Sequence, residues 1–296
     1  MFERVETIIR ELVEEVDFLQ ATQLFAKLSG GKRLRARLIL AIAPTHPDAA
    51  RLGAIVELIH AASLLHDDVI DDSMLRRGVA SVNATHGSKV AIMLGDILYS
   101  KAFSALTAFD PEIARTISQS VTQLSVGEMM DVEMSGAFNL DRELYLKMLY
   151  LKTATLIESC AYCAALLDGK DANAYGVYGK NLGLAFQIVD DILDIIGDEA
   201  TLGKPALNDF VEGKTTLPYI DLYDILDDLD KSKLIGCHGR VLEPEEKQWL
   251  SNAMQEHNII ERSYVRAQEL CDEALNAIGD EAALRAILIS VIKRRH

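Results

Sequence analysis

Apolar residues recur every three or four positions along nearly the whole chain, and this period restricts the fold more than any other feature. The pattern is longest in residues 51–65, 90–106, 114–134 and 181–196. A period near 3.6 residues places the apolar side chains on one face of a helix. The sequence contains no convincing series of alternating strands and no hairpin dipeptide between them. It therefore predicts an all-α fold.

The domain organisation follows from what the sequence lacks. A chain of 296 residues can form one large domain or two smaller ones. No linker rich in Ser, Gly or Pro divides it, and no repeat of fixed period is visible. We expect residues 1–296 to form a single domain. The longest irregular stretches are predicted at 72–86 and 197–213, each after an aspartate cluster, where a loop could cover a charged site.

Composition excludes several classes of protein. Hydrophobic residues make up 49% of the chain, enough to bury a core, so a disordered protein is excluded. The net charge of −15, without a basic stripe, argues against a nucleic-acid partner. Few cysteines, no signal peptide and no stretch judged long and apolar enough to span a bilayer predict a soluble cytoplasmic protein without stable membrane insertion. Cys160 and Cys163 lie in an apolar helical run and are predicted to fill the core.

The first aspartate cluster is the segment HDDVIDD, which follows an apolar helical run. If the helix continues, Asp67 and Asp71 share one face, and Asp68 and Asp72 form a second such pair. Carboxylates this close repel one another, and Mg²⁺ offsets the repulsion while keeping water and phosphate oxygens as ligands. A solvated acidic face is the alternative, but the apolar helix before the cluster indicates a pocket. An EF-hand is excluded because Gly78 stands where that loop needs a glutamate.

A second cluster, QIVDDILD, contains Asp190, Asp191 and Asp194 and also closes an apolar helix. Asp190 and Asp194 share one face. Two clusters of the same spacing, each followed by an irregular loop, predict two metal-binding segments. The acidic run at 221–230 lies close to lysines and lacks such flanks, so we expect a solvated helix face there.

Basic residues accompany both clusters. In the segment GGKRLR, the glycines permit close approach of the backbone, and Lys32 and Arg35 at a helix start make an anion site. The segment lacks the spacing of a P-loop, so a nucleoside triphosphate is not implied. Further cations are Arg76 and Arg77 after the first cluster, and Lys152, Lys204 and Lys214 around the second. The pairing predicts phosphates held by metal ions and cationic side chains.

Three segments, GGKRLR, LLHDDVIDDSMLRRG and FQIVDDILDIIGDEATLGKPALNDFVEGKTTLPYI, resemble the signatures of trans-isoprenyl diphosphate synthases. The resemblance extends in order over roughly residues 28–220 and is strongest to bacterial polyprenyl synthases of the octaprenyl type. It implies an antiparallel helical bundle of the isoprenoid synthase type around a deep central cavity. It also implies a homodimer and Mg²⁺, with three ions per active site. One departure is Ala36, where the family often has proline.

The resemblance assigns roles to individual residues. The expected Mg²⁺ ligands are Asp67, Asp68, Asp71, Asp190, Asp191 and Asp194, with Asp190 the best candidate for direct ligation. The positions that match isopentenyl diphosphate binding are Lys32, Arg35, His60 and Arg77. Those that match allylic diphosphate binding are Arg76, Lys152, Thr153, Gln187, Lys204 and Lys214. The expected catalytic set is Asp67, Asp68, Asp71, Arg76, Lys152, Asp190 and Lys204.

The implied reaction is the condensation of isopentenyl diphosphate with an allylic diphosphate, either farnesyl or geranylgeranyl diphosphate. Metals and cations would stabilise the leaving diphosphate, which is then the expected base. Ala62 and Ser63 are small, and neither Phe nor Tyr occurs at 61–66, where bulky aromatic residues go with short products in this family. We therefore expect an octaprenyl-class product, with geranylgeranyl diphosphate as the alternative. Candidate residues for the floor of the product cavity are Met93, Leu94, Tyr99, Leu124 and Met129.

Other functions explain fewer of the motifs. An HD-type phosphohydrolase would use the dyad His66-Asp67 but leaves the second aspartate cluster and GGKRLR unexplained; we expect a structural role for His66. A terpene cyclase would have a different second metal motif and no use for Lys32 and Arg35. A non-catalytic partner subunit would be expected to lose motif residues, and this chain keeps them all.

Overall fold

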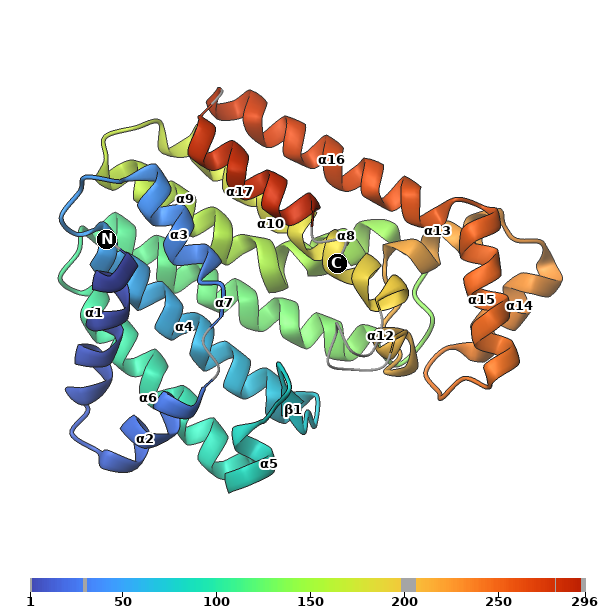
Figure 1. Cartoon of the computed structure of the whole chain (residues 1–296), viewed down its shortest axis with the longest axis horizontal. Helices are drawn as coiled ribbons and strands as arrows, with labels where there is room; N and C mark the ends of the chain where they lie inside the picture. The colour runs from blue at the N-terminus through green and yellow to red at the C-terminus, as the bar shows by residue number, and fades with distance from the viewer. Residues whose placement is uncertain (1, 29–30, 198–205, 280, 294–296) are drawn as a thin grey trace. The chain divides into compact units, whose positions relative to one another are not determined.

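The computed structural model of the chain describes residues 2–28, 31–197, 206–279 and 281–293 (Figure 1). The chain is 78% helical, which confirms the all-α prediction. In chain order the elements are α1 (Phe2–Glu14), α2 (Leu19–Lys27), α3 (Leu34–Ile42), α4 (Ala49–Ile70), β1 (Leu75–Arg76), β2 (Val79–Ala80), α5 (Val82–His86), α6 (Ser88–Leu106), α7 (Pro111–Met134), α8 (Arg142–Leu149), η1 (Tyr150–Ala154), α9 (Thr155–Leu167), α10 (Ala172–Ile196), α12 (Asn208–Val211), α13 (Leu217–Ile225), α14 (Asp228–Cys237), α15 (Pro244–Glu256), α16 (Ile259–Ile278) and α17 (Ala282–Ile292).

The helices group into two compact units. Unit 1 comprises Met1–Val121 and Ser159–Gly176, and unit 2 comprises Thr122–Glu158 and Val177–His296. The aspartate motif at 67–71 lies in unit 1, and the motif at 190–194 lies in unit 2. Each unit therefore contains one of the two aspartate motifs.

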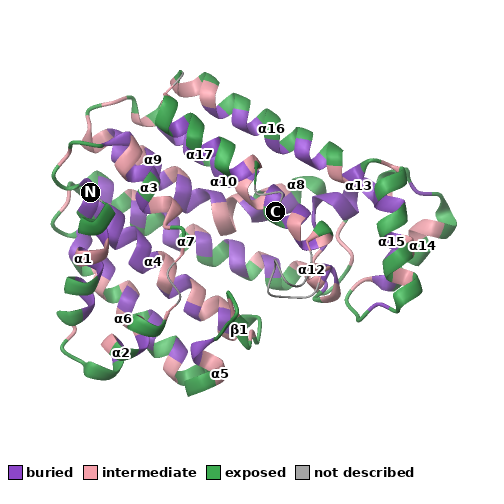
Figure 2. Cartoon of the chain, in the orientation of Figure 1, coloured by how far each residue is buried: buried purple, intermediate pink, exposed green. Residues whose placement is uncertain are grey.

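Helix α4 is the core of unit 1. Its side chains at Leu52, Ile55, Leu58 and Ile59 are completely buried, and the helix packs against α1, α3 and α6 (Figure 2). Each such side chain contributes about 1.5–3 kcal/mol on burial. By length and composition α4 could cross a membrane, so the expectation that no stretch is long and apolar enough is wrong. In this structure 78% of its most apolar window is buried inside the protein.

The core of unit 2 includes a cluster formed by α12, α13, α14 and α15. Phe210 and Tyr219 are completely buried and stack with ring centroids 4.2 Å apart. Helix α13 begins at Leu217, after the capping residue Thr216, and has Pro218 in its first turn, where proline is tolerated. The Tyr178 hydroxyl of α10 donates to the carbonyl of Leu284 in α17, 2.9 Å away. The last of these contacts ties α10, which carries the second aspartate motif, to α17.

The segment 72–86 is not irregular, contrary to the sequence-based expectation. Strands β1 and β2 form an antiparallel hairpin, and helix α5 follows it. The turn contains Arg77 and Gly78, which both have positive φ values of 54° and 75°. Such a turn matches the twist of the strands, but Asn-Gly or Asp-Gly is its usual sequence. An arginine at the first position gives no hairpin signal.

Candidate active site

The first aspartate motif lies at the C-terminal end of α4. The N–H of Asp71, the capping residue, donates to the carbonyl of Asp67 at 2.8 Å, so both remain on one helix face as predicted. The predicted second pair is wrong: Asp72 has a φ of 48°, which takes it out of the helix that carries Asp68. Asp68 is buried instead, and its Oδ1 accepts a hydrogen bond from Nε of Arg76 at 2.6 Å.

The electrostatics of Asp68 combine burial with one ion pair. Burial raises the pKa of the Asp68 carboxyl and Asp71 adds to this, whereas Arg76 opposes the shift. Asn83 donates from Nδ2 to the carbonyls of Asp68 and Ser73, each at 3.0 Å. Asn83 thus fixes the segment that follows α4. Sequence reasoning missed this role because the contact spans 15 residues.

Gly31 of the GGKRLR segment lies directly against the guanidinium of Arg77. A Cβ atom at Gly31 would lie 2.6 Å from Nη1 of Arg77, so a larger residue there would displace the end of that side chain. The glycine therefore permits the close approach predicted from the sequence, here toward a cationic side chain. Gly30 lies outside the described residues.

The start of α3 depends on Glu57, a buried carboxylate of α4. The Glu57 Oε1 accepts a hydrogen bond from the backbone N–H of Ala36 at 3.0 Å. Glu57 also lies 3.5 Å from Nη1 of Arg33, whose Nε donates to Glu6 at 2.9 Å. A proline at position 36 could not donate this bond, so the departure from the family pattern adds a contact. The signal in the sequence was that Glu57 is an acidic residue within the apolar run AIVELIH.

Arginines surround His60 in unit 1. The Nε atom of Arg35 is buried and has no hydrogen-bond partner among the described residues. Burial lowers the pKa of Arg35, against the opposing charge of Glu57. The pKa of His60 lies well below its usual value because of burial and then the charges of Arg35, Arg77, Arg76 and Arg33. The imidazole is therefore neutral at pH 7, and the positive charge around it suits an anion. Lys32 is exposed.

His66 packs against α6. Its Nε2 lies 3.1 Å from the carbonyl of Ile92 and 3.5 Å from Oδ1 of Asp96. A Cβ atom at Gly95 would lie 2.3 Å from Nε2, so this glycine makes room for the ring. The geometry agrees with the structural role expected for His66. It does not favour metal ligation of the HD type.

In unit 2, the short π-helix η1 presents Lys152 and Thr153. Such single-turn π-helices are rare and frequently occur at functional sites. A Cβ atom at Gly127 of α7 would lie 2.3 Å from the backbone N of Lys152. At Gly183 of α10, a Cβ atom would lie 2.5 Å from the Cα of Ala154. These glycines allow α7 and α10 to contact the backbone of η1 closely, which fixes the two predicted binding residues.

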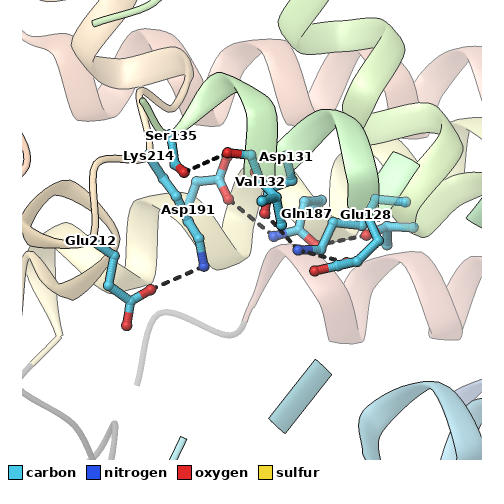
Figure 3. Close-up of polar contacts among 10 residues, drawn as sticks. Glu128, Asp131, Val132, Ser135, Gln187, Asp191, Glu212 and Lys214 are labelled. Atoms are coloured by element: carbon cyan, nitrogen blue, oxygen red, sulfur yellow. Dashed lines mark hydrogen bonds and ion pairs between the residues drawn. The ribbon is translucent and has the colours of Figure 1, made fainter. Parts of the chain in front are cut away.

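Two buried carboxylates of α7 hold the ammonium of Lys152. The Lys152 Nζ lies 2.6 Å from Oδ2 of Asp131 and 2.9 Å from Oε2 of Glu128 (Figure 3 labels both acids). Burial lowers the pKa of Lys152, but Asp131 and Glu128 outweigh burial and leave the pKa raised; Lys214 opposes them. Lys152 is therefore positively charged. Sequence reasoning missed both acids, whose signal was their three-residue spacing on one face of α7.

Asp191 of the second motif is buried, and protein donors satisfy both of its oxygens. Oδ2 accepts from the hydroxyl of Tyr145. Oδ1 accepts from Nε2 of Gln187 at 3.0 Å (Figure 3). Gln187 in turn accepts from Thr153 at 3.0 Å. Burial raises the pKa of Asp191 well above its usual range, and the charge of Asp209 adds to the shift. The hydrogen bonds from Tyr145 and Gln187 oppose it. This carboxyl group links α8, α10 and η1.

The other members of the second motif differ in exposure. Asp190 is exposed, whereas Asp194 is buried and accepts a hydrogen bond from the N–H of Asp209 at 3.1 Å. The Nζ of Lys214 lies 3.0 Å from Oε2 of Glu212 (Figure 3). Lys204 lies outside the described residues. Of the three aspartates, Asp190 has the exposure that a direct metal ligand needs.

The residues predicted to set product length lie in the packed part of α4. Ala62 is completely buried, and Ser63 is buried with its Oγ donating to the carbonyl of His60 at 3.0 Å. The candidate floor residues differ: Leu94 and Leu124 are buried, Met93 and Met129 are exposed, and the Tyr99 ring stacks on that of Phe103. Leu94 and Leu124 are thus core residues of the chain.

The carboxylates fit a metal ion that shares its ligands with substrate. Among the described residues, no three His, Cys, Asp or Glu side chains form a closed metal-binding group. Mg²⁺ does not require one, because proteins bind it through one or two carboxylates, several waters and substrate phosphates. Asp67 and Asp71 on one helix face, and the exposed Asp190, provide oxygen donors of this kind.

Comparison with known proteins gives consistent matches. The polyprenyl synthetase family model matches residues 19–255. The short chain isoprenyl diphosphate synthase of Methanothermobacter thermautotrophicus is 32% identical, over 99% of this chain and 95% of that protein. The octaprenyl pyrophosphate synthase structure from Helicobacter pylori is 40% identical, with a TM-score of 0.93, covering 99% of this chain and 100% of that one. The Caulobacter crescentus polyprenyl synthase complexed with calcium and isoprenyl diphosphate is 30% identical, with a TM-score of 0.90 over 99% and 94%.

These matches confirm the helical isoprenoid synthase fold predicted from the signature segments. Enzymes of this family use a divalent metal. Their substrates are isopentenyl diphosphate and an allylic diphosphate. The chain belongs to the polyprenyl synthetase family, and it is a prenyltransferase.

Proposed function

We propose that the protein condenses isopentenyl diphosphate with farnesyl or geranylgeranyl diphosphate to make an all-trans product of the octaprenyl class. One observation supports this most strongly: the arginine cluster around the neutral His60, close in sequence to the aspartate motif of α4. An excess of guanidinium groups in a part-buried site stabilises a diphosphate through charge-assisted hydrogen bonds. The positive charges of this cluster favour the binding of an anion.

The proposal assigns each substrate to a set of residues. Isopentenyl diphosphate is bound by Lys32, Arg35, His60 and Arg77, and the allylic diphosphate by Arg76, Lys152, Thr153, Gln187, Lys204 and Lys214. The two aspartate motifs bind Mg²⁺, three ions per site, with Asp190 as a direct ligand. When bound, the metal supplies positive charge to the leaving diphosphate.

The residues of the chain orient the reacting groups. Lys152, fixed on η1 between its two acids, and Arg76, fixed by Asp68, hold positive charge where the diphosphate departs. As a neutral ring, His60 donates a hydrogen bond from its protonated ring nitrogen to a phosphate oxygen. The departed diphosphate is the expected base, and it takes the proton lost on condensation.

The proposed product class is supported by small residues of α4 and by the names of the relatives. Ala62 and Ser63 leave no bulky side chain one turn before Asp67. The Helicobacter relative is named for an octaprenyl product and the Methanothermobacter relative for a short chain. The higher identity to the former supports the longer product, which a deep central cavity would hold. Geranylgeranyl diphosphate is the alternative product.

We also propose that residues 1–296 act as one domain in a cytoplasmic homodimer without stable membrane insertion. Helix α7 exposes Val126, Met129 and Val132, with relative exposures of 45%, 64% and 51%. Their three-residue spacing places these apolar side chains along one side of α7, as an interface between copies requires. Light scattering of Met129→Lys, which should yield monomers, tests the dimer.

The activity is tested by incubating the purified protein with Mg²⁺, labelled isopentenyl diphosphate and farnesyl diphosphate. The extracted prenyl alcohols are then sized. We expect a ladder of products that ends in the octaprenyl class and is abolished by a chelator. A ladder that stops at geranylgeranyl would favour the alternative product. No condensation with any allylic primer at saturating Mg²⁺ would overturn the proposal.

A further inference from the structure

His238, which follows α14, contacts the residues on both sides of Lys214. Its Nε2 lies 3.1 Å from Oγ1 of Thr215, and its ring also hydrogen-bonds to the backbone of Gly213. The histidine lies 24 residues after Lys214 and belongs to none of the motifs described above. The proposed function leaves it without a role.

The backbone around Lys214 is fixed by further contacts. Gly213 has a φ of 87°, and a Cβ atom there would lie 2.5 Å from the carbonyl of Ser135. The N–H of Lys214 donates to the carbonyl of Asp209 at 2.8 Å. The buried hydroxyl of Thr215 accepts from the N–H of Asn139 at 3.1 Å. The segment 213–215 is therefore packed closely against Ser135, and it is hydrogen-bonded to Asn139 in the loop after α7 and to Asp209 of α12.

Aromatic rings hold His238 in place. Phe138 and Phe210 meet it edge to face, with ring centroids 5.2 and 5.3 Å away. Burial lowers the pKa of His238, opposed by its hydrogen bond to Gly213, so the ring is neutral at pH 7. Since Nε2 faces Thr215, we assign Nδ1–H to the carbonyl of Gly213. Nε2 then accepts the hydroxyl proton of Thr215, whose oxygen accepts from Asn139.

The ammonium of Lys214 acts on the site of the allylic diphosphate. Its charge lowers the pKa of Lys152, so the two ammonium groups lie near each other in unit 2. Without substrate, Lys214 pairs with Glu212 at 3.0 Å. An incoming diphosphate competes with Glu212, and it gains most if the backbone of Lys214 is already fixed.

We propose that His238 is a positioning residue for Lys214. By bonding to Gly213 and Thr215, it fixes the segment 213–215 so that the lysine reaches the allylic diphosphate. This inference rests on the proposed function, because it needs Lys214 to bind that substrate. It predicts an effect on one substrate and not on the other.

The test uses three variants that separate the contacts of the ring. His238→Phe keeps the packing on Phe138 and Phe210 but removes both hydrogen bonds. His238→Asn keeps a donor near Gly213, and His238→Gln keeps a polar group near Thr215. We expect His238→Phe to raise the KM for farnesyl diphosphate about tenfold, the effect of losing one or two hydrogen bonds. The KM for isopentenyl diphosphate should stay unchanged, with the other variants intermediate.

Two controls separate positioning from stability. Leu234→Ala removes a buried side chain of the same hydrophobic cluster and should lower Tm without changing either KM. In a Lys214→Gln background, His238→Phe should add nothing further to the KM for farnesyl diphosphate. Equal increases in both KM values, a change in Tm alone, or a full effect without Lys214 would each overturn the inference. An inactive wild-type protein would instead overturn the proposed function.

Discussion

The two aspartate motifs lie in opposite electrostatic surroundings. In unit 1, arginines surround His60, and Asp68 of the motif is paired with Arg76. In unit 2, the charge of Lys152 is offset by two carboxylates, and the carboxyl of Asp191 lies within reach of further acids. Arginines are thus concentrated around His60, and carboxylates around Lys152 and Asp191.

This difference shows that similar motifs need not do the same work. A cluster of arginines binds a diphosphate directly through charged hydrogen bonds. A cluster of carboxylates repels phosphate and accepts it only with a divalent cation in place. We therefore expect variants in unit 2 to change the metal dependence most, and variants of the arginine cluster in unit 1 to change substrate affinity.

The largest effect is expected at Asp190. Asp190→Asn should lower kcat by about 10³-fold and raise the Mg²⁺ concentration for half-maximal activity, because a charged oxygen ligand is lost. Steady-state assays across a Mg²⁺ titration measure both. Asp228→Asn, at an exposed position in the first turn of α14, is the matched control and should leave kcat unchanged. If Asp190→Asn retained a tenth of the activity, the contrast between the motifs would not hold.

Arg35→Leu should separate binding from stability in unit 1. The KM for isopentenyl diphosphate should rise about 10- to 100-fold, since a charged hydrogen bond contributes about 1.5–3 kcal/mol. The Tm should stay constant or increase, because the variant removes a buried guanidinium whose Nε has no partner among the described residues. Kinetics and thermal melts test this. Arg37→Leu, exposed on the same helix, should change neither; a large fall in Tm for Arg35→Leu would show a structural role instead.

Gly183→Ala tests whether the close packing of η1 matters for unit 2. Its Cβ would lie 2.5 Å from Ala154, so the backbone must move, at a cost of about 1–3 kcal/mol. The KM for farnesyl diphosphate should rise as Lys152 and Thr153 shift. Gly236→Ala is the control, since its Cβ meets nothing within 4 Å and should stabilise α14 by about 0.5–1 kcal/mol. Urea denaturation and kinetics measure both; equal effects would contradict the role given to η1.

The sequence predicts the parts of this structure that depend on local pattern. Helical period identified the apolar helices, and the spacing of Asp67 and Asp71 placed them on one face. The hairpin was missed because Arg77-Gly78 is not a usual turn pair. The π-helix was missed because Gly127 and Gly183, which pack closely against it, are distant from it in the sequence.

The site residues that the sequence missed act over long distances in the chain. Glu57 caps a helix 21 residues away, and Asp131 reaches Lys152 across 21 residues. Tyr145 binds an aspartate 46 residues later. No local pattern encodes such partners, because they meet only after the helices pack. The charged residues proposed to bind substrate could be read from motifs, whereas the residues that orient them could not.

The smallest expected effect is a pH dependence of stability that originates in unit 1. His60 has a folded-state pKa well below its usual value, so the unfolded chain takes up a proton below about pH 6.5 that the folded chain does not. Stability should therefore fall as pH decreases from about 7 to 5, by at most about 1.4 kcal/mol per pH unit from this group. His60→Gln should flatten that slope, as measured by urea denaturation at several pH values.

In unit 2, His238 is the histidine with which His60 can be compared. The pKa of His238 is lowered by burial without any arginine charge, so His238→Gln should flatten the slope less than His60→Gln. Inorganic diphosphate sharpens the test, because an anion among the arginines raises the pKa of His60. It should therefore remove the contribution of His60 to the pH dependence of stability. The effect of His238→Gln on the slope should be the same with and without diphosphate. If diphosphate left the slope of the wild-type protein unchanged, His60 would not lie in the anion site, and the arginine cluster would be a structural feature of unit 1.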